Sequence, residues 1–170
     1  MPSSRTWKVL FLCTHNSARS ILSEALLRHH GEGRFEACSA GSAPAEGQRP
    51  HPLGLLALEQ AGIDTRGLAS KNWTVFSGPQ AQPMDLVITV CGSAAGETCP
   101  VWPGTPERAH WGHEDPSRVP GSPEQRLAAF HATLEQIRAR TLAFVAGSRD
   151  LKTSAELGAL ARRLESHGTV

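Results

Sequence analysis

The stretch from Val9 to Ser20 constrains the fold of this chain more than any other. The apolar run from Val9 to Leu12 is typical of a buried strand and ends on Cys13, and small or polar residues then lead to Arg19, where a helical pattern begins. A cysteine in that place faces the N-terminus of the next helix, whose N–H groups and partial positive charge bind oxyanions and favour a thiolate. The planar guanidinium of Arg19 suits tetrahedral anions. The segment therefore predicts a nucleophile, an anion-binding loop and a positive clamp in one place.

A plainer interpretation exists for each of these residues. A cysteine at the end of a buried strand is often only a packing residue. Packing alone does not require an arginine and a helix start directly behind Cys13, so we favour the catalytic interpretation. Ser17 and Ser20 are good helix caps, and we expect them to cap this helix and to donate hydrogen bonds to the thiolate.

Strand and helix patterns alternate along the chain, which predicts an α/β fold. We expect a three-layer sandwich in which a four-stranded parallel sheet carries helices on both faces. The expected strands are 8–12, 34–40, 84–90 and 108–111, and the expected helices are 20–30, 52–61, 122–145 and 154–165. Apolar spacing puts Leu134, Ile137 and Leu142 on the inward side of the third helix. The stretches 91–106 and 112–121 predict loops, and 67–78 predicts a short helix or turn.

Composition narrows the function classes. A chain of 170 residues fits one domain, and its formal net charge of +1 gives no reason to expect nucleic acid or an anionic membrane as partner. No apolar stretch is long enough for a secretory signal or a membrane span, so we expect a cytoplasmic protein. Four cysteines are too few for a secreted disulfide scaffold, and their spacing contains no Cys-x-x-Cys element, so we expect no metal site. Cys38 lies within an expected strand, and we interpret it as a buried structural thiol.

Three separated segments are expected to meet at one edge of the sheet. Cys13 ends the first strand, Cys91 ends the strand 84–90, and the loop from His113 to Pro116 follows the strand 108–111. Ligands of open α/β sheets bind outside the carboxyl ends of the strands. The two cysteines and this loop therefore belong to one candidate site.

These motifs resemble the low-molecular-weight protein tyrosine phosphatase superfamily and, within it, the thioredoxin-coupled arsenate reductases that use internal cysteines. The resemblance covers residues 8–145 and implies the phosphotyrosine phosphatase I-like fold. We therefore expect a reductase domain over 1–147 and a C-terminal extension over 148–170 that forms a short helix. The matching segments are Cys13 to Ser20, Ser39 to Ser42, Ser70 to Trp73, Asp85 to Cys91, Cys99-Pro100, His110 to Gly112 and Asp115-Pro116.

The resemblance implies a role for each matching residue. Cys13 is the nucleophile that attacks arsenate, Arg19 is the anion clamp and Asp115 is the general acid. Cys91 then attacks Cys13 to release arsenite, and Cys99 attacks Cys91 to carry the disulfide to an external thiol. The oxyanion-binding residues are Thr14, His15, Asn16, Ser17, Ala18, Arg19 and Ser20.

The resemblance also implies a substrate and a reductant. The substrate is arsenate or a phosphate-like oxyanion, and the reductant is thioredoxin, with glutathione or mycothiol as alternatives. No metal or organic cofactor is expected, and we expect a monomer or weak dimer.

Asn16, Ser20, Glu24, Ser39 and Lys71 match residues that support the loop in the family. Some thioredoxin-coupled relatives bind a potassium ion behind the loop, and Asn16, Glu24 and Ser39 match that site. A carboxylate expected near Ser70 is replaced by Lys71. We therefore expect the Lys71 ammonium to take the place of the cation and to pair with Glu24.

Two alternatives remain open from the sequence. The first is a low-molecular-weight phosphatase that hydrolyses phosphomonoesters through a cysteinyl-phosphate while the downstream cysteines stay passive. The phosphatase branch usually has tyrosines after its Asp-Pro, where this chain has Ser117 and Arg118. This difference makes the phosphatase hypothesis less favoured. The second is a non-catalytic module that binds oxyanions or senses redox state.

Overall fold

The protein is built around one parallel sheet. The computed structural model describes residues 6–77, 81–90 and 106–165. Four strands, β1 (Trp7–Cys13), β2 (Phe35–Gly41), β3 (Leu86–Thr89) and β4 (Glu107–His110), pair in parallel in the order β2-β1-β3-β4. This confirms the predicted α/β fold with a four-stranded parallel sheet.

β1 is a central strand and is apolar on both faces, as buried parallel strands are. Val9 and Phe11 point into one core with helix residues, whereas Leu10 and Leu12 point into a second cluster on the other face. In the register, Cys13 lies beside Gly41, so both strands end at the same edge.

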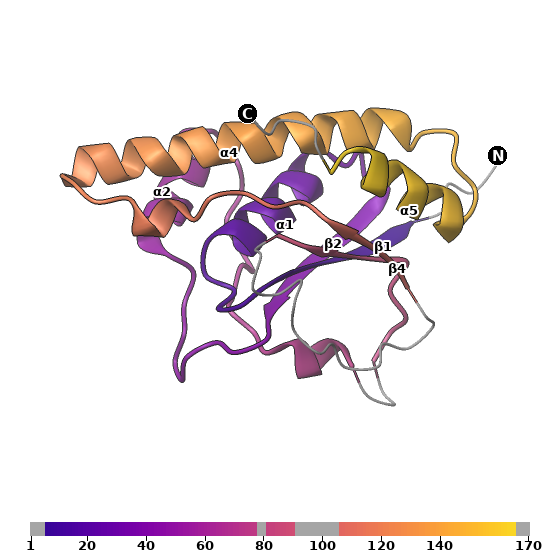
Figure 1. Cartoon of the computed structure of the whole chain (residues 1–170), viewed down its shortest axis with the longest axis horizontal. Helices are drawn as coiled ribbons and strands as arrows, with labels where there is room; N and C mark the ends of the chain where they lie inside the picture. Colours follow the sequence, from indigo (N-terminus) through magenta and orange to yellow (C-terminus); the bar gives the residue numbers. More distant parts are fainter. Residues whose placement is uncertain (1–5, 78–80, 91–105, 166–170) are drawn as a thin grey trace.

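The helices lie mainly on one face of the sheet. Figure 1 shows α1 (Arg19–His30), the long α4 (Pro123–Gly147) and α5 (Ser154–Arg163) on that side, while the short 3-10 helix η1 (Trp73–Phe76) lies on the other. α2 (Pro52–Gln60) packs against α4 and α1. Both long C-terminal helices begin with a capping box: Ser122 with Gln125 in α4, and Thr153 with Glu156 in α5.

The predicted C-terminal extension contains α5, which packs closely on the sheet. Leu157 and Ala161 are fully buried in the same core as Trp7 and Phe11. The indole Nε1 of Trp111 donates to the backbone oxygen of Ala161 at 2.9 Å. α5 therefore covers β4.

Two expectations about local structure are wrong. The stretch 112–121 is not loop throughout, because Asp115 caps a 3-10 helix, η2 (Pro116–Arg118), by accepting a hydrogen bond from the Ser117 N–H. Leu142 does not point inward: it is 44% exposed, while Thr141 and Phe144 are buried. A helix of 25 residues drifts out of phase with a fixed apolar spacing, and the two ends of α4 pack into different clusters, with Phe130 in one and Phe144 in the other. Within the described residues, no helix is long and apolar enough to span a membrane.

Candidate active site

The loop between β1 and α1 forms a cradle. We use this name for residues 13–19, from the end of β1 to the first residue of α1. The backbone oxygens of Cys13, Thr14, Asn16 and Ser17 all accept hydrogen bonds from outside the loop. Because C=O and the following N–H point in opposite directions across a trans peptide, the N–H groups of the cradle are turned toward its interior.

The helix start behind the cradle is open to a ligand. The N-cap of α1 is Ala18, and no side chain caps the helix there. The expectation that Ser17 and Ser20 cap this helix is therefore wrong; Ser20 instead accepts a hydrogen bond from Asn16 at 2.8 Å. Uncapped N–H groups at a helix start are available to an anion.

Asn16 holds the shape of the cradle. Its backbone has a φ of 55°, in the left-handed region that asparagine tolerates, and it is fully buried. The Asn16 Nδ2 donates to Ser20 Oγ at 2.8 Å and to Ser39 Oγ at 2.9 Å, and its Oδ1 accepts the Lys71 N–H at 2.9 Å. One side chain thus ties the loop to α1, to β2 and to the segment before η1.

A buried carboxylate continues this network. Glu24, on α1, is 2% exposed and accepts a hydrogen bond from Ser39 Oγ at 2.5 Å. Its second oxygen pairs with Arg28, one helical turn later. The expected ion pair between Lys71 and Glu24 is therefore wrong: the Lys71 ammonium donates to the Ala69 backbone oxygen at 2.6 Å, and Lys71 supports the cradle through its backbone. Arg28 escaped the sequence analysis, although the spacing of four residues in a helix is a known signal for such pairs.

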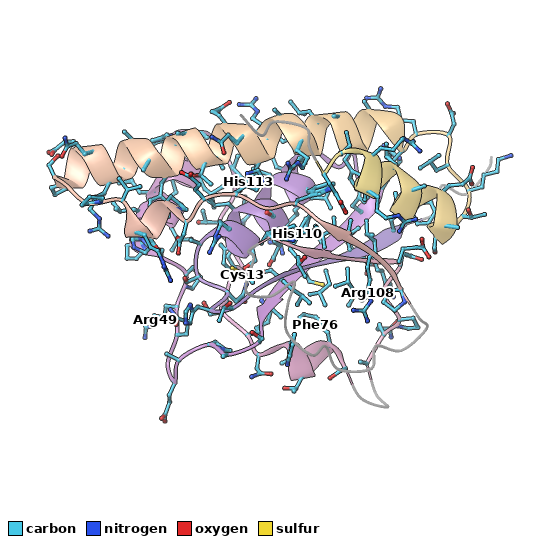
Figure 2. All side chains as sticks on the ribbon, viewed as in Figure 1. Cys13, Arg49, Phe76, Arg108, His110 and His113 are labelled. Carbon is cyan, nitrogen blue, oxygen red and sulfur yellow. The ribbon has the colours of Figure 1, made fainter. Side chains whose placement is uncertain are left out.

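The interior of the cradle is a small cavity of about 100 Å³. Cys13 is 7% exposed at its base. None of the described lining residues is a phenylalanine or tryptophan. They are Cys13, Thr14, His15, Asn16, Ser17, Ala18, Arg19, Asp115 and Arg118. Figure 2 shows Cys13 and His113 in the same part of the molecule, beside the start of α1.

Arg19 is held by the loop that follows β4. Its Nη1 donates to the His113 backbone oxygen at 2.8 Å, and its Nη2 lies 3.5 Å from Asp115 Oδ2. Its Nε is buried and has no hydrogen-bond partner among the described residues. A buried N–H without a partner is costly, so a bound oxyanion would satisfy it.

Asp115 faces the cavity with one oxygen. Its Oδ1 accepts from the Ser117 N–H at 3.0 Å and from Ser117 Oγ at 2.6 Å, while Arg118 Nε lies 3.6 Å from Oδ2. Partial burial by itself would raise the pKa of Asp115, but the two hydrogen bonds from Ser117 and the charges of Arg19 and Arg118 outweigh it and lower this pKa. The carboxyl is therefore ionised at neutral pH before a ligand binds. Arg118 was noted in the sequence only as a departure from the phosphatase pattern, although it stands one 3-10 turn after Asp115.

The other cysteines divide into two groups. Cys38 is a thiol on β2 whose Sγ lies 3.6 Å from the Val9 backbone oxygen, and burial raises its pKa to about 12. A thiol with such a pKa is inert as a nucleophile. Cys91 and Cys99 lie outside the described residues. Among the described residues, no group of His, Cys, Asp or Glu could hold a metal ion.

Comparison with known proteins gives a consistent result. Residues 8–156 match the family described as Low molecular weight phosphotyrosine protein phosphatase. An arsenate reductase of Halalkalibacterium halodurans is 32% identical over 136 residues, which are 80% of this chain and 93% of that protein. A solved structure, "An arsenate reductase in the phosphate binding state", is 27% identical with a TM-score of 0.62, covering 83% of this chain and 98% of the other. A thioredoxin-dependent arsenate reductase of Corynebacterium glutamicum is 26% identical with a TM-score of 0.53, covering 79% of this chain and 61% of the other.

Proposed function

The chain belongs to the low molecular weight phosphotyrosine protein phosphatase family, and we propose that it reduces arsenate to arsenite within that family. Relatives named arsenate reductase support the proposal, because their alignment with this chain covers most of the length of each relative. A phosphate-bound relative supports a tetrahedral oxyanion as the substrate class. The role would be arsenic detoxification.

The observation that carries the proposal is the cradle itself. It combines a buried thiol, inward N–H groups and a guanidinium whose Nε has no partner among the described residues. The cavity of about 100 Å³ suits a compact anion, and none of its described lining residues offers an aromatic wall for a phosphotyrosine ring. These features favour an inorganic oxyanion over an aryl phosphate.

In the first step the Cys13 thiolate attacks arsenic. A bond forms between Sγ and arsenic, an As–O bond breaks, and the departing oxygen takes a proton and leaves as water. We propose Asp115 as the donor of that proton. The bound oxyanion would share the charge of Arg19 and place negative charge beside the carboxyl, which raises its pKa from the low value of the ligand-free protein.

In the second step a further thiol is needed, and we propose Cys91. Its thiolate would attack the Cys13 Sγ, so that the electron pair of the S–As bond passes to arsenic and arsenite leaves. Cys99 would then attack Cys91, restore the Cys13 thiol and leave a Cys91–Cys99 disulfide. An external dithiol would reduce that disulfide, so one arsenate and one dithiol yield arsenite, water and a disulfide.

We propose thioredoxin as the external dithiol, which the Corynebacterium relative supports. Glutathione or mycothiol would deliver the same electrons. A relay of thiols requires a reducing compartment, so we propose the cytoplasm as the site of action. We also propose that residues 1–147 form the reductase domain and that 148–170 are an extension carrying α5.

The relay is tested by single-turnover release of arsenite from the pre-reduced protein and its Cys→Ser variants. We expect one equivalent of arsenite from Cys99→Ser and none from Cys91→Ser or Cys13→Ser. Cys38→Ser is the matched control, because that thiol is inert, and it should turn over like the wild type with added thioredoxin system. Arsenite release by Cys91→Ser would refute the relay. Phosphomonoester hydrolysis that persists in Cys91→Ser, without arsenite release by the wild type, would favour the phosphatase instead.

A further inference from the structure

A buried arginine outside the cradle has no part in the chemistry above. Arg140, on α4, is fully buried. Its Nη1 lies 3.1 Å from His113 Nε2, its Nη2 donates to the Glu165 backbone oxygen at 3.1 Å, and its guanidinium lies 5.6 Å from the centre of the Trp111 ring. Arginine stays charged in proteins, so its burial is unfavourable unless such contacts compensate it. The three contacts therefore fix Arg140 in one orientation.

His113 connects this arginine to the cradle. Its ring contacts α4 through Nε2, which lies beside Arg140 Nη1. Its backbone oxygen accepts the hydrogen bond from Arg19 Nη1 at 2.8 Å. The ring thus anchors the peptide whose carbonyl orients the anion clamp, and Asp115 follows two residues later.

This segment has room to move if the anchor is removed. Residues from Gly112 to Pro116 line one side of a cavity of about 550 Å³, and α4 residues Ala129 to Gln136 line the other. The His113 carbonyl lies at the edge of this cavity, so its position depends on the contacts that anchor the His113 side chain. A shift of the His113 carbonyl would release Arg19 Nη1 from its present direction.

We propose that Arg140 and His113 are positioning residues that hold the Arg19 guanidinium in its oxyanion-binding orientation. The end of α5 takes part, because the Glu165 carbonyl binds the other amino group of Arg140. Glu165 lies beyond the residues 8–156 that match the family, so this support comes from the C-terminal part of the chain. The inference rests on the proposed oxyanion site but is independent of the cysteine relay.

The test is the binding of inorganic phosphate to the reduced full-length protein, measured by calorimetry at a temperature where circular dichroism shows each variant folded. We expect Arg140→Met and His113→Leu to weaken phosphate binding by about tenfold, the effect of losing one well-oriented hydrogen bond to a charged group. His113→Gln keeps an acceptor for Arg140, so it should restore binding to within about threefold of the wild type. In arsenate reduction, Arg140→Met and His113→Leu should raise KM more than they lower kcat.

The matched control is Arg34→Met. Arg34 is also largely buried, and its guanidinium donates hydrogen bonds to the Val145 backbone oxygen, on α4, and to Ser148 Oγ, directly after α4. It precedes β2, which is the edge strand on the other side of the sheet from β4. It should destabilise the fold and leave phosphate binding unchanged. Wild-type affinity in both Arg140→Met and His113→Leu would overturn the proposal, as would an equal loss in Arg34→Met or no recovery in His113→Gln. No phosphate binding by the wild type would overturn the oxyanion site as well, whereas phosphate binding without arsenite release would refute only the reductase.

Discussion

Replacing Asn16 separates the two ways in which this residue stabilises the cradle. The side chain makes two buried hydrogen bonds and a third that is partly buried, and the backbone holds a φ of 55°. Each bond contributes about 1 kcal/mol to the free energy of unfolding, and alanine adds roughly 1 kcal/mol of left-handed strain. We therefore expect Asn16→Ala to lower the free energy of unfolding by about 3–4 kcal/mol.

Asn16→Gly isolates the strain. Glycine loses the same three hydrogen bonds but adopts positive φ freely, at the cost of a more flexible unfolded chain. It should be about 0.5–1 kcal/mol more stable than Asn16→Ala, the reverse of the order in a helix or strand. Urea unfolding of the reduced protein, followed by tryptophan fluorescence, measures both differences.

Asn72→Ala is the matched control for these variants. Asn72 is exposed and caps η1 through one hydrogen bond from the Thr74 N–H at 3.0 Å, so its loss should cost only about 1 kcal/mol. If Asn16→Ala costs no more than Asn72→Ala, the hydrogen bonds of Asn16 do not stabilise the cradle. If Asn16→Ala is more stable than Asn16→Gly, the argument from backbone strain is wrong.

Three further predictions follow from the same geometry. A Cβ on Gly41 would lie 2.6 Å from the Thr14 backbone oxygen, so Gly41→Ala should weaken phosphate binding in calorimetry by about tenfold or more, whereas Gly54→Ala, with 3.4 Å to the Phe130 ring, should bind phosphate normally. Arg118 is 85% exposed, so Arg118→Ala should weaken phosphate binding only about two- to fivefold; by raising the pKa of Asp115, the proposed proton donor, it should also move the alkaline limb of arsenate reduction to higher pH, and Arg66→Ala, 91% exposed, should change neither. Burial and the charges of Arg140, Arg19 and His110 lower the pKa of His113 from 6.5 to about 4, so the wild type should lose stability as the pH falls between these two values, and His113→Leu should flatten that part of the unfolding free energy curve.

The sequence predicted the sheet and the cradle because both follow from local patterns. The predicted strand 8–12 is apolar at every position except Lys8, and such near-continuous apolar runs are typical of buried parallel strands. The meeting of Cys13 with the loop around Asp115 followed from topology alone, since the carboxyl ends of parallel strands share an edge. The observed separation between Arg19 and Asp115, 3.5 Å, agrees with that expectation.

Pairing between charged side chains could not be predicted in the same way. Only Lys71 was expected to pair with Glu24, and the choice between Lys71 and Arg28 depends on a few ångströms of side-chain reach. The helix places Arg28 one turn from Glu24, whereas the Lys71 ammonium finds the Ala69 carbonyl two residues before it. The role of Arg140 could not be predicted for a related reason: a charged residue in a helix is usually exposed, and Arg140 is buried by contacts with His113, Trp111 and Glu165, which are distant in the sequence.

The structure also suggests how one cradle can serve two reactions. In the proposed site the inward N–H groups and Arg19 would bind the oxyanion, and neither feature distinguishes arsenate from phosphate. Selection between hydrolysis and reduction must then lie in what reaches the covalent adduct next, a water molecule or a second thiolate. Since Asp115 is ionised before the ligand binds and faces two guanidiniums, it is a poor proton donor until the oxyanion shares their charge. In the proposed mechanism, binding of the oxyanion therefore prepares Asp115 as the acid, and the position of the second thiol decides the product.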